Sequence, residues 1–418
     1  MSSITVPDGP AGVPARILLF TGKGGVGKTT TAAAAAVSSA RAGIETLVLS
    51  TDAAHSLGDA FGVDLRGGGG PVAIEEHLHA LQVSGRAHFA GSWTVVHAYL
   101  VQTLSALGVD PLVAEEMTSL PGAEEIAALL ELRTQAESGR WDLVVVDCAP
   151  TAETLRMLAL PENLAWHLGR MIPGTVGLRR AARPAAAAAL GIPLPGVEIL
   201  EVIRDWYADM LAVRAILGSG RASVRLVTTP ESVVIAESRR TWTSLSLYGY
   251  AVDAIYVNKI LPYVGAGETG AAAAWLASWN DAQERGFGEV VSSFAGIAVV
   301  RAPYLAREPV GPDALAALGS SWVDESGIGL DILDAVDAAA MRVDRTADGY
   351  TLALRLPLTS AREVGLQRRE DDLILTVGDH RRIVTLPAVL TRCTVSGASV
   401  RSGSLTVGFV PDPAQWPR

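Results

Sequence analysis

The pattern of apolar and polar positions divides the chain into parts with different periodicity. From residue 16 onward, short and almost continuously apolar runs alternate with long stretches of helical pattern. Such runs are typical of parallel strands buried on both faces, and the helices between them are typical of βα crossovers. We therefore predict an α/β fold with a doubly wound, mostly parallel sheet, whose strands lie at 17–20, 46–50, 143–146, 224–227, 254–257 and 298–300.

Two stretches between these runs, 93–140 and 153–220, hold few strand signals and are predicted to form a helical subdomain. The second stretch contains apolar residues at three- and four-residue spacing, which a helix places on one face. A stripe of this kind fits the core or a dimer contact, and it also fits the lining of a groove. It consists of Ile199, Ile203, Trp206, Met210, Val213 and Leu217.

The periodicity of the apolar residues changes near residue 340. Apolar residues then recur two apart, as at Leu352, Leu354 and Leu356, and turn residues separate the runs. This alternation predicts an antiparallel β-sandwich at 341–410. We accordingly expect a loose N-terminal tail at 1–15, an α/β domain at 16–310, a linker helix at 311–340, the sandwich, and a tail at 411–418.

Composition and charge narrow the function. The chain has 34 basic and 44 acidic residues and a net charge of −10, which argues against a broad nucleic-acid footprint or adsorption to anionic lipid. No uncharged apolar run reaches about 18 residues, and the N-terminus lacks a signal-peptide pattern, so we expect a cytoplasmic protein without stable membrane insertion. The two cysteines, Cys148 and Cys393, exclude a disulfide framework and any site that needs clustered thiolates.

Lysine is scarce, and its placement is informative. Only Lys23, Lys28 and Lys259 are lysines among the 34 basic residues. Two of them lie in one glycine-rich loop, which indicates that the ammonium group itself is needed there.

That loop follows the first predicted strand and opens an alanine-rich helix, as a P-loop does. Its sequence satisfies GxxxxGK[ST] from Gly22 to Thr29. Lys28 is expected to reach the β- and γ-phosphates of ATP, and Thr29 to hold Mg²⁺. The predicted phosphate-binding set is Gly22, Lys23, Gly24, Gly25, Val26, Gly27, Lys28, Thr29 and Thr30.

Three further segments carry a family resemblance. They read STDAAHSLGDAF at 50–61, PGAEE at 121–125 and WDLVVVDCAPTAETLR at 141–156. Together with GKGGVGKT, a deviant Walker A motif, they resemble the arsenical pump-driving (ArsA) and guided-entry tail-anchored-targeting ATPase family over about residues 16–310.

The resemblance implies roles for individual residues. Lys23 would cross to a partner subunit's nucleotide, which implies an ATP-sandwiched homodimer. Asp52 would be the general base that orients the attacking water, and Asp147 would hold Mg²⁺ through water. Asn258 would read adenine beneath a covering loop that includes Pro303 and Tyr304. The implied switch residues are Asp52, His55, Ser56, Asp147, Ala149, Pro150 and Thr151.

Departures from the family pattern limit what is carried over. Ala53 replaces a proline, and Ala152-Glu153 replaces Gly-His, so we expect slow basal turnover. A single P-loop and the missing cysteine cluster argue against an arsenite pump. Without a CxxC motif we expect no zinc, and without bridging cysteines no iron–sulfur cluster. The C-terminal residues 411–418 do not form the amphipathic membrane helix of partitioning ATPases.

The C-terminal module resembles an α-crystallin (small heat-shock protein) domain. The resemblance rests on GYTLALRLP at 349–357, LILTV at 373–377, RRIVTLP at 381–387 and GSLTV at 403–407. No IxI tail follows, so we expect a fused accessory domain.

The leading hypothesis is an ATP-hydrolysing homodimer that binds hydrophobic protein clients, including transmembrane segments, when ATP closes it. The alternative is a nucleotide-switch scaffold whose β-sandwich binds the partner. A small-molecule kinase fits less well, because no acceptor-site pattern is present.

Overall fold

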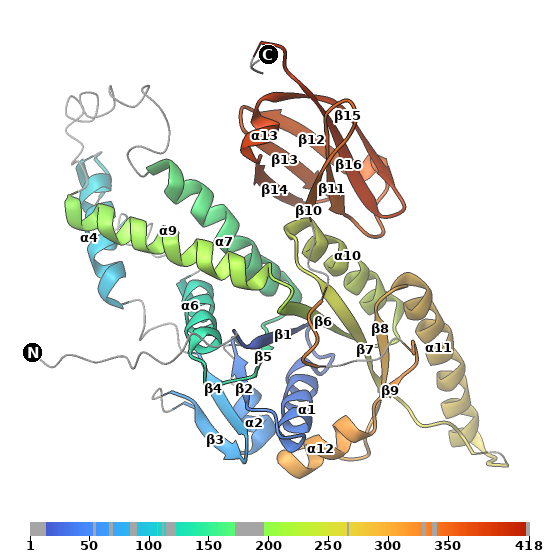
Figure 1. Cartoon of the computed structure of the whole chain (residues 1–418). Coiled ribbons are helices and arrows are strands. Elements are labelled where there is room, and N and C mark those ends of the chain that lie inside the picture. The colour runs from blue at the N-terminus through green and yellow to red at the C-terminus, as the bar shows by residue number, and fades with distance from the viewer. Residues whose placement is uncertain are drawn as a thin grey trace, which may run out of the picture. The chain divides into compact units, whose positions relative to one another are not determined.

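A nine-stranded sheet forms the centre of the first domain (Figure 1). The computed structural model describes residues 14–52, 56–66, 70–83, 90–106, 108–110, 113, 123–171, 196–265, 267–327, 332–336 and 341–414. The strand order is β3-β4-β2-β5-β1-β6-β7-β8-β9, and pairing is parallel from β4 to β8. The strands are β1 (Arg16–Thr21), β2 (Thr46–Ser50), β3 (Val72–Glu75), β4 (Leu78–Gln82), β5 (Leu143–Asp147), β6 (Ala222–Thr228), β7 (Val252–Ile260), β8 (Ala298–Pro303) and β9 (Val323–Asp324).

The six apolar runs predicted as strands are all strands of this sheet, which confirms the doubly wound fold. The sheet also has members that the sequence did not predict, namely β3, β4 and β9. The expected linker helix over 311–340 is wrong in extent. Helix α12 covers only Pro312–Ser320, because Trp322 then packs on the core and Val323 pairs with Arg301 of β8.

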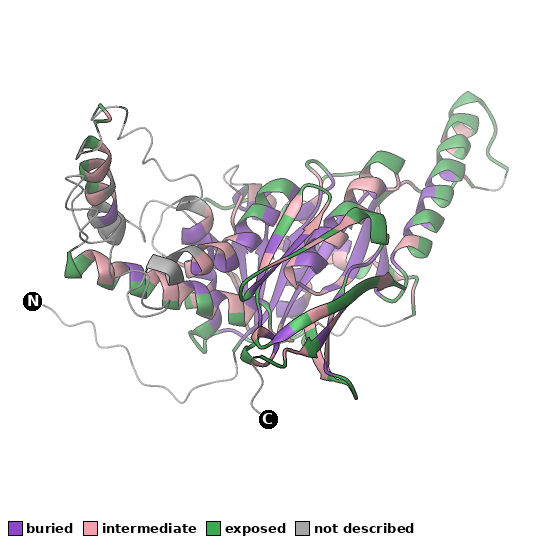
Figure 2. Cartoon of the chain, turned by 90° about the horizontal axis from the view of Figure 1, so that it is seen from above, coloured by how far each residue is buried: buried purple, intermediate pink, exposed green. Residues whose placement is uncertain are grey.

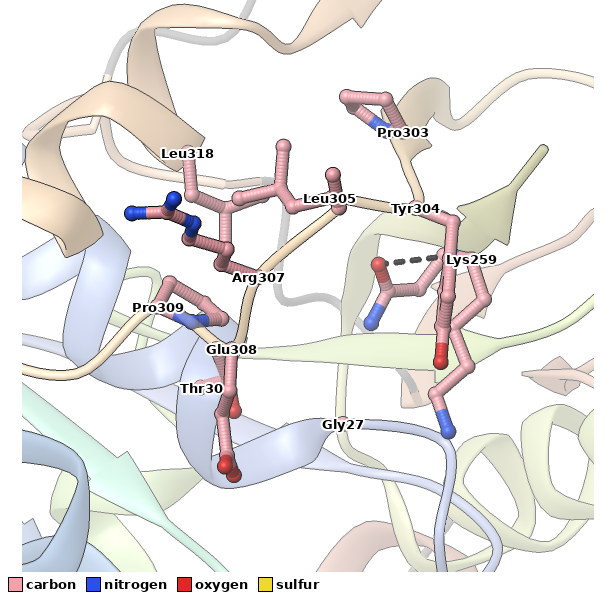
Figure 3. A pocket seen from close by; sticks show the side chains of 12 residues that line it. Gly27, Thr30, Lys259, Pro303, Tyr304, Leu305, Arg307, Glu308, Pro309 and Leu318 are labelled. Carbon is pink, nitrogen blue, oxygen red and sulfur yellow. Dashed lines mark hydrogen bonds between the residues drawn. The ribbon is translucent and has the colours of Figure 1, made fainter. Parts of the chain in front are cut away.

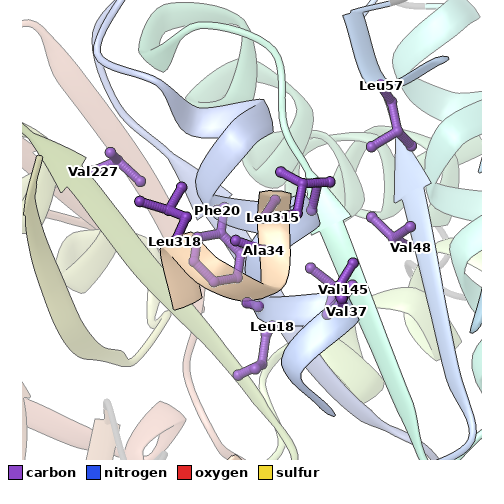
Figure 4. Close-up of a cluster of buried hydrophobic side chains, with 14 of the residues drawn as sticks. Leu18, Phe20, Ala34, Val37, Val48, Leu57, Val145, Val227, Leu315 and Leu318 are labelled. Atoms are coloured by element: carbon purple, nitrogen blue, oxygen red, sulfur yellow. The ribbon is translucent and has the colours of Figure 1, made fainter. Parts of the chain in front are cut away.

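Helix α1 (Lys28–Arg41) is almost completely buried against the sheet (Figure 4). Its alanine run, Ala32–Ala36, is at most 1% exposed, and such small side chains let a helix lie close to its neighbours. Leu315 and Leu318 of α12 join the same core cluster as Ala34 and Val37. The other helices of this unit are α2 (Ser56–Phe61), α10 (Ser232–Tyr248) and α11 (Ala271–Ser293), of which α11 is exposed over most of its first half (Figure 2).

A second compact unit consists of residues 83–134 and 156–216. It holds α4 (Ala90–Ala106) and most of α6 (Ala123–Glu137), α7 (Thr151–Met171) and α9 (Val197–Leu217), as the helical pattern predicted. Ion pairs join its helices: Arg133 Nη1 lies 2.6 Å from Asp209 Oδ1, and Arg214 Nη2 lies 2.9 Å from Glu162 Oε1. Among the described helices, none is both long and apolar enough to span a membrane.

The C-terminal strands form the predicted antiparallel sandwich, with sheets ordered β10-β11-β16-β15 and β12-β13-β14. The sandwich belongs to the same unit as the nine-stranded sheet, and Leu247 of α10 is part of its core. Arg382 Nη1 donates to Leu247 O at 2.7 Å, and Thr243 Oγ1 donates to Pro357 O at 2.9 Å. The strands are β10 (Met341–Arg345), β11 (Tyr350–Arg355), β12 (Val364–Arg369), β13 (Asp372–Val377), β14 (His380–Thr385), β15 (Cys393–Arg401) and β16 (Ser404–Pro411), with α13 (Ala388–Thr391) after β14.

Candidate active site

The glycine-rich loop joins β1 to α1, as the motif requires, and its glycines are sterically demanded. A Cβ atom on Gly22 would lie 2.1 Å from Val227 O. Gly27 adopts a φ of 95°, and a Cβ there would lie 2.4 Å from Asn258 Nδ2. Only glycine therefore fits at either position, which gives the loop backbone the freedom to wrap an anion.

Helix α1 begins at Lys28, so its N-terminus points its free N–H groups toward the loop. The Lys28 side chain is 7% exposed, and its Nζ lies 3.4 Å from Lys23 O. Thr29 and Thr30 follow in the first turn and are half-buried. Backbone donors, a helix N-terminus and an ammonium group thus converge on one position, which is an anion-binding arrangement.

Two carboxylates stand at the carboxyl ends of neighbouring strands. Asp147 ends β5 beside Ser50 of β2, and its Oδ2 accepts a hydrogen bond from Ser50 Oγ at 3.2 Å. The Asp147 side chain is fully buried, and its Oδ1 has no hydrogen-bond partner among the described groups. Burial raises the pKa of Asp147 to about 7, although the nearby Thr29 hydroxyl and Lys28 ammonium lower it. Asp52 lies two residues beyond β2 and is half-buried.

Hydrogen bonds tie the two predicted switch segments together. Thr51 N donates to Asp147 O at 3.0 Å, and Ala149 N donates to Thr51 Oγ1 at 3.3 Å. Pro150 is half-buried, and the buried Thr151 hydroxyl has no partner in the described part of the chain. Because of these hydrogen bonds, a movement of one segment would displace the other.

Gln82, which the sequence analysis missed, supports the first switch segment from β4. Its Nε2 donates to Asp52 O at 2.9 Å and lies 3.5 Å from Ser50 O. The side chain is 6% exposed. No local pattern could have indicated this role, because Gln82 lies 30 residues from Asp52 in the chain.

A cavity of about 430 Å³ opens beside the loop (Figure 3). Asn258, Pro303 and Tyr304, which the resemblance places around adenine, line it together with Gly27 and Thr30. Arg307 and Glu308, which belong to the same covering loop, also line it. A cavity between a phosphate-type loop and a covering loop suits a nucleoside.

Asn258 braces the loop as well as lining the cavity. Its Nδ2 donates to Val26 O at 2.9 Å, and its Oδ1 accepts a hydrogen bond from Lys259 N at 2.8 Å (Figure 3). Lys23 points to α10 in this single chain, where its Nζ lies 3.9 Å from Glu237 Oε2. Both of these side chains are partly exposed, so this ion pair is weak.

Other predicted residues have mixed outcomes. Ala53, His55 and residues 121–122 lie outside the described residues, whereas Ser56 begins α2. In the stripe on α9, Ile203, Met210, Val213 and Leu217 are at most 4% exposed, whereas Ile199 and Trp206 are half-buried. Most of the stripe is thus core in this conformation.

Comparison with known proteins agrees with this geometry. The family model for the anion-transporting ATPase ArsA matches residues 15–324, and the model for the HSP20-like domain found in ArsA matches residues 347–409. A protein of Mycobacterium tuberculosis is 37% identical over 430 residues, covering 97% of this chain and 99% of that protein. The "Putative arsenical pump-driving ATPase" of Chlorobaculum tepidum is 34% identical over 403 residues, covering 94% and 96%.

An uncharacterised protein of Streptomyces coelicolor is similar over its full length too, with 37% identity over 406 residues that cover 96% of this chain and 99% of that protein. These matches extend across both domains, so the combination of P-loop domain and sandwich is shared. The chain therefore belongs to the ArsA ATPase family, hydrolyses ATP, and carries the HSP20-like domain associated with that family.

Proposed function

We propose that this ATPase works as a homodimer that binds hydrophobic protein segments, transmembrane segments among them, and that ATP controls the binding. The observation that carries the proposal is the course of α7. This helix begins at Thr151, four residues after Asp147, and runs on into the helical unit. A shift of the second switch segment upon hydrolysis would therefore move a helix of that unit directly.

At the nucleotide site, Lys28 would neutralise the β- and γ-phosphates, and Lys23 would reach the partner subunit's nucleotide after leaving Glu237. Asp52 would accept the proton of the attacking water, held in place by the bond from Gln82 to its backbone. Thr29 and Asp147 fit a Mg²⁺ ion, since the buried, unpartnered Oδ1 of Asp147 suits a metal-bound water. The ion would neutralise the developing phosphate charge.

The helical unit offers apolar surface for a client. On α9, Val197 is 72% exposed and Leu211 is 40% exposed, and the helical repeat places both on the face opposite the half-buried Ile199 and Trp206. The buried members of the stripe would contribute only if the helices separate. An amphipathic helix that moves with the nucleotide state suits the capture of an apolar segment.

An arsenite pump remains the weaker reading. Cys148 and Cys393 are both buried, in the P-loop domain and in the sandwich core respectively. Burial also raises the pKa of both thiols, which disfavours the thiolate that would bind arsenite.

The alternative, a nucleotide switch that uses the sandwich to bind a partner, is favoured by α10. That helix holds Glu237 beside Lys23 near its start and contributes Leu247 to the sandwich core near its end. A change at the loop could thus reach the sandwich through one helix.

Paired surface variants distinguish the two readings. Asp52→Asn protein, loaded with Mg·ATP, is titrated with a fluorescent 20-residue apolar peptide, and the anisotropy is recorded. We expect Leu211→Glu on α9 to weaken binding about tenfold, and Val410→Glu, at a similarly exposed position on the sandwich (36% against 40%), to leave it unchanged. The reverse pattern would support the sandwich as the binding module. As the folding control, the melting temperature of each variant is measured and should equal that of the parent protein.

A further inference from the structure

All three lysines of the chain meet at the P-loop. Lys23 and Lys28 belong to the loop itself, and Lys259 reaches it from β7, 234 residues from its partner in the chain. Lys259 Nζ donates to Gly25 O at 2.7 Å. Lys259, the one lysine outside the motif, therefore also contacts the loop.

The backbone at Lys259 is shaped to make this contact. The pairing of β7 with β8 shifts register between Val257 and Ile260, and Lys259 has a φ of 60°. A non-glycine residue in this region is strained, and such strain persists only where the surroundings hold it. Here the bond from Lys259 N to Asn258 Oδ1 holds it, and the side chain is turned out of the sheet to the cavity wall.

Lys259 and Asn258 together hold two consecutive carbonyl groups of the loop. Lys259 Nζ binds Gly25 O, and Asn258 Nδ2 binds Val26 O. In a trans peptide the C=O and N–H groups point in opposite directions. Fixing these two carbonyls on the β7 side therefore turns the N–H groups of Val26 and Gly27 away from β7, as donors for a phosphate.

We propose that Lys259 is a positioning residue for nucleotide binding, whose ammonium group holds the P-loop with its N–H donors in place before the phosphates arrive. This hydrogen bond holds the backbone of the loop and not the nucleotide, so its contribution is to preorganisation. It should strengthen binding of the ground state and the transition state alike, which changes KM more than kcat. The inference rests on ATP hydrolysis alone and is independent of the client.

The test replaces the ammonium and then restores it. In Lys259→Met the donor is lost at nearly constant length, and we expect KM for ATP to rise about tenfold, as for loss of one exposed charge-assisted bond, with kcat within about twofold of wild type. In Lys259→Cys, alkylation with 2-bromoethylamine rebuilds a side chain of lysine length that ends in an ammonium group. The native cysteines are both buried, so the new thiol is the accessible one.

A neutral propyl adduct on the same Lys259→Cys protein is the matched control. We expect the aminoethyl adduct to return KM to within about threefold of wild type, and the propyl adduct to stay near Lys259→Met. Unchanged KM in Lys259→Met, a fall in kcat at constant KM, or equal recovery with the propyl group would each overturn the proposal. Thermal unfolding of every species shows whether the fold is intact, and wild-type protein treated with each reagent shows whether other sites react.

Discussion

At the residue scale, side chains that are distant in the sequence support the residues of the candidate site. Lys28, Thr29 and Asp147 lie within short patterns that follow apolar strands. Gln82 and Glu237 carry no such pattern, because their partners Asp52 and Lys23 are distant in the chain. Three-dimensional contact, which a single sequence does not display, is the reason that these supporting residues were missed.

Replacement of Gln82 tests the support of the first switch segment. Gln82→Leu removes the donor to Asp52 O and puts an apolar side chain of similar size in its place. We expect kcat to fall about tenfold with KM little changed, because Asp52, the proposed general base, would lose its position while the glycine-rich loop stays intact. Steady-state ATPase assays measure both constants. Gln82→Glu, which places an acceptor against the carbonyl, should be at least as impaired; wild-type kcat in both variants would show that the bond is unimportant.

The buried carboxylate of Asp147 is expected to lower the stability of the folded protein when it is ionised. Burial raises its pKa from 3.8 to about 7, so the folded protein binds this proton more tightly than the unfolded chain. The resulting loss of stability is absent below about pH 4, grows between about pH 4 and 7, and is complete above that.

Asp147→Asn should therefore raise the melting temperature of the nucleotide-free protein at pH 8 by a few degrees, and leave it nearly unchanged at pH 4. The same variant should lose Mg²⁺-dependent hydrolysis. Scanning calorimetry at the two pH values, beside an ATPase assay, gives the answer. Equal melting temperatures at pH 8 would contradict the placement of an ionised, poorly compensated carboxylate here.

At the element scale, long and strongly patterned elements were predicted and short ones were not. Six buried strands and the alternating strands of the sandwich have clear periodicity. Strand β9 has only two residues and β3 is largely exposed, so neither shows a period. The helix expected over 311–340 stops at Ser320 because tertiary packing of Trp322 competes with local helical preference.

Helix α10 joins the sandwich to the P-loop domain, and Arg382 makes one of the polar contacts between them. Arg382 is 4% exposed and donates to Leu247 O near the end of the helix. Arg382→Met should destabilise the protein by about 1–3 kcal/mol, since it leaves that buried carbonyl without its donor. Urea unfolding measures the loss, with the exposed Arg342→Met in the same sandwich as control. An unchanged unfolding midpoint would contradict the docking.

At the scale of the whole molecule, the two kinds of basic residue are distributed differently: arginines occur throughout the chain, and the lysines gather at the glycine-rich loop. Arginine accounts for 31 of the 34 basic residues, and the three lysines lie at the glycine-rich loop, so nearly every primary amine is at the candidate nucleotide site. The whole chain has a net charge of −10, so this cluster of ammonium groups is a local positive region on an acidic protein.

Acetylation of the protein should accordingly abolish ATPase activity without unfolding it, and Mg·ATP should protect. Peptide mass mapping after treatment with an amine-selective acetylating reagent identifies which of Lys23, Lys28 and Lys259 is modified. We expect inactivation to follow modification of these residues and to slow at least tenfold with nucleotide bound. Full activity after complete acetylation would mean that the ammonium groups are dispensable.

The most direct measurement of the central claim, that ATP controls the binding of hydrophobic segments, is the affinity of Asp52→Asn protein for the fluorescent apolar peptide in each nucleotide state. We predict that the dissociation constant is at least tenfold lower with Mg·ATP than with Mg·ADP, because in the proposed function the segment leading into α7 responds to the γ-phosphate. Lys28→Ala, which should not retain ATP, is expected to behave like the ADP state. Equal affinity with ATP and ADP, or no binding in either state, would contradict the proposed function and leave the ATPase as a switch for another partner.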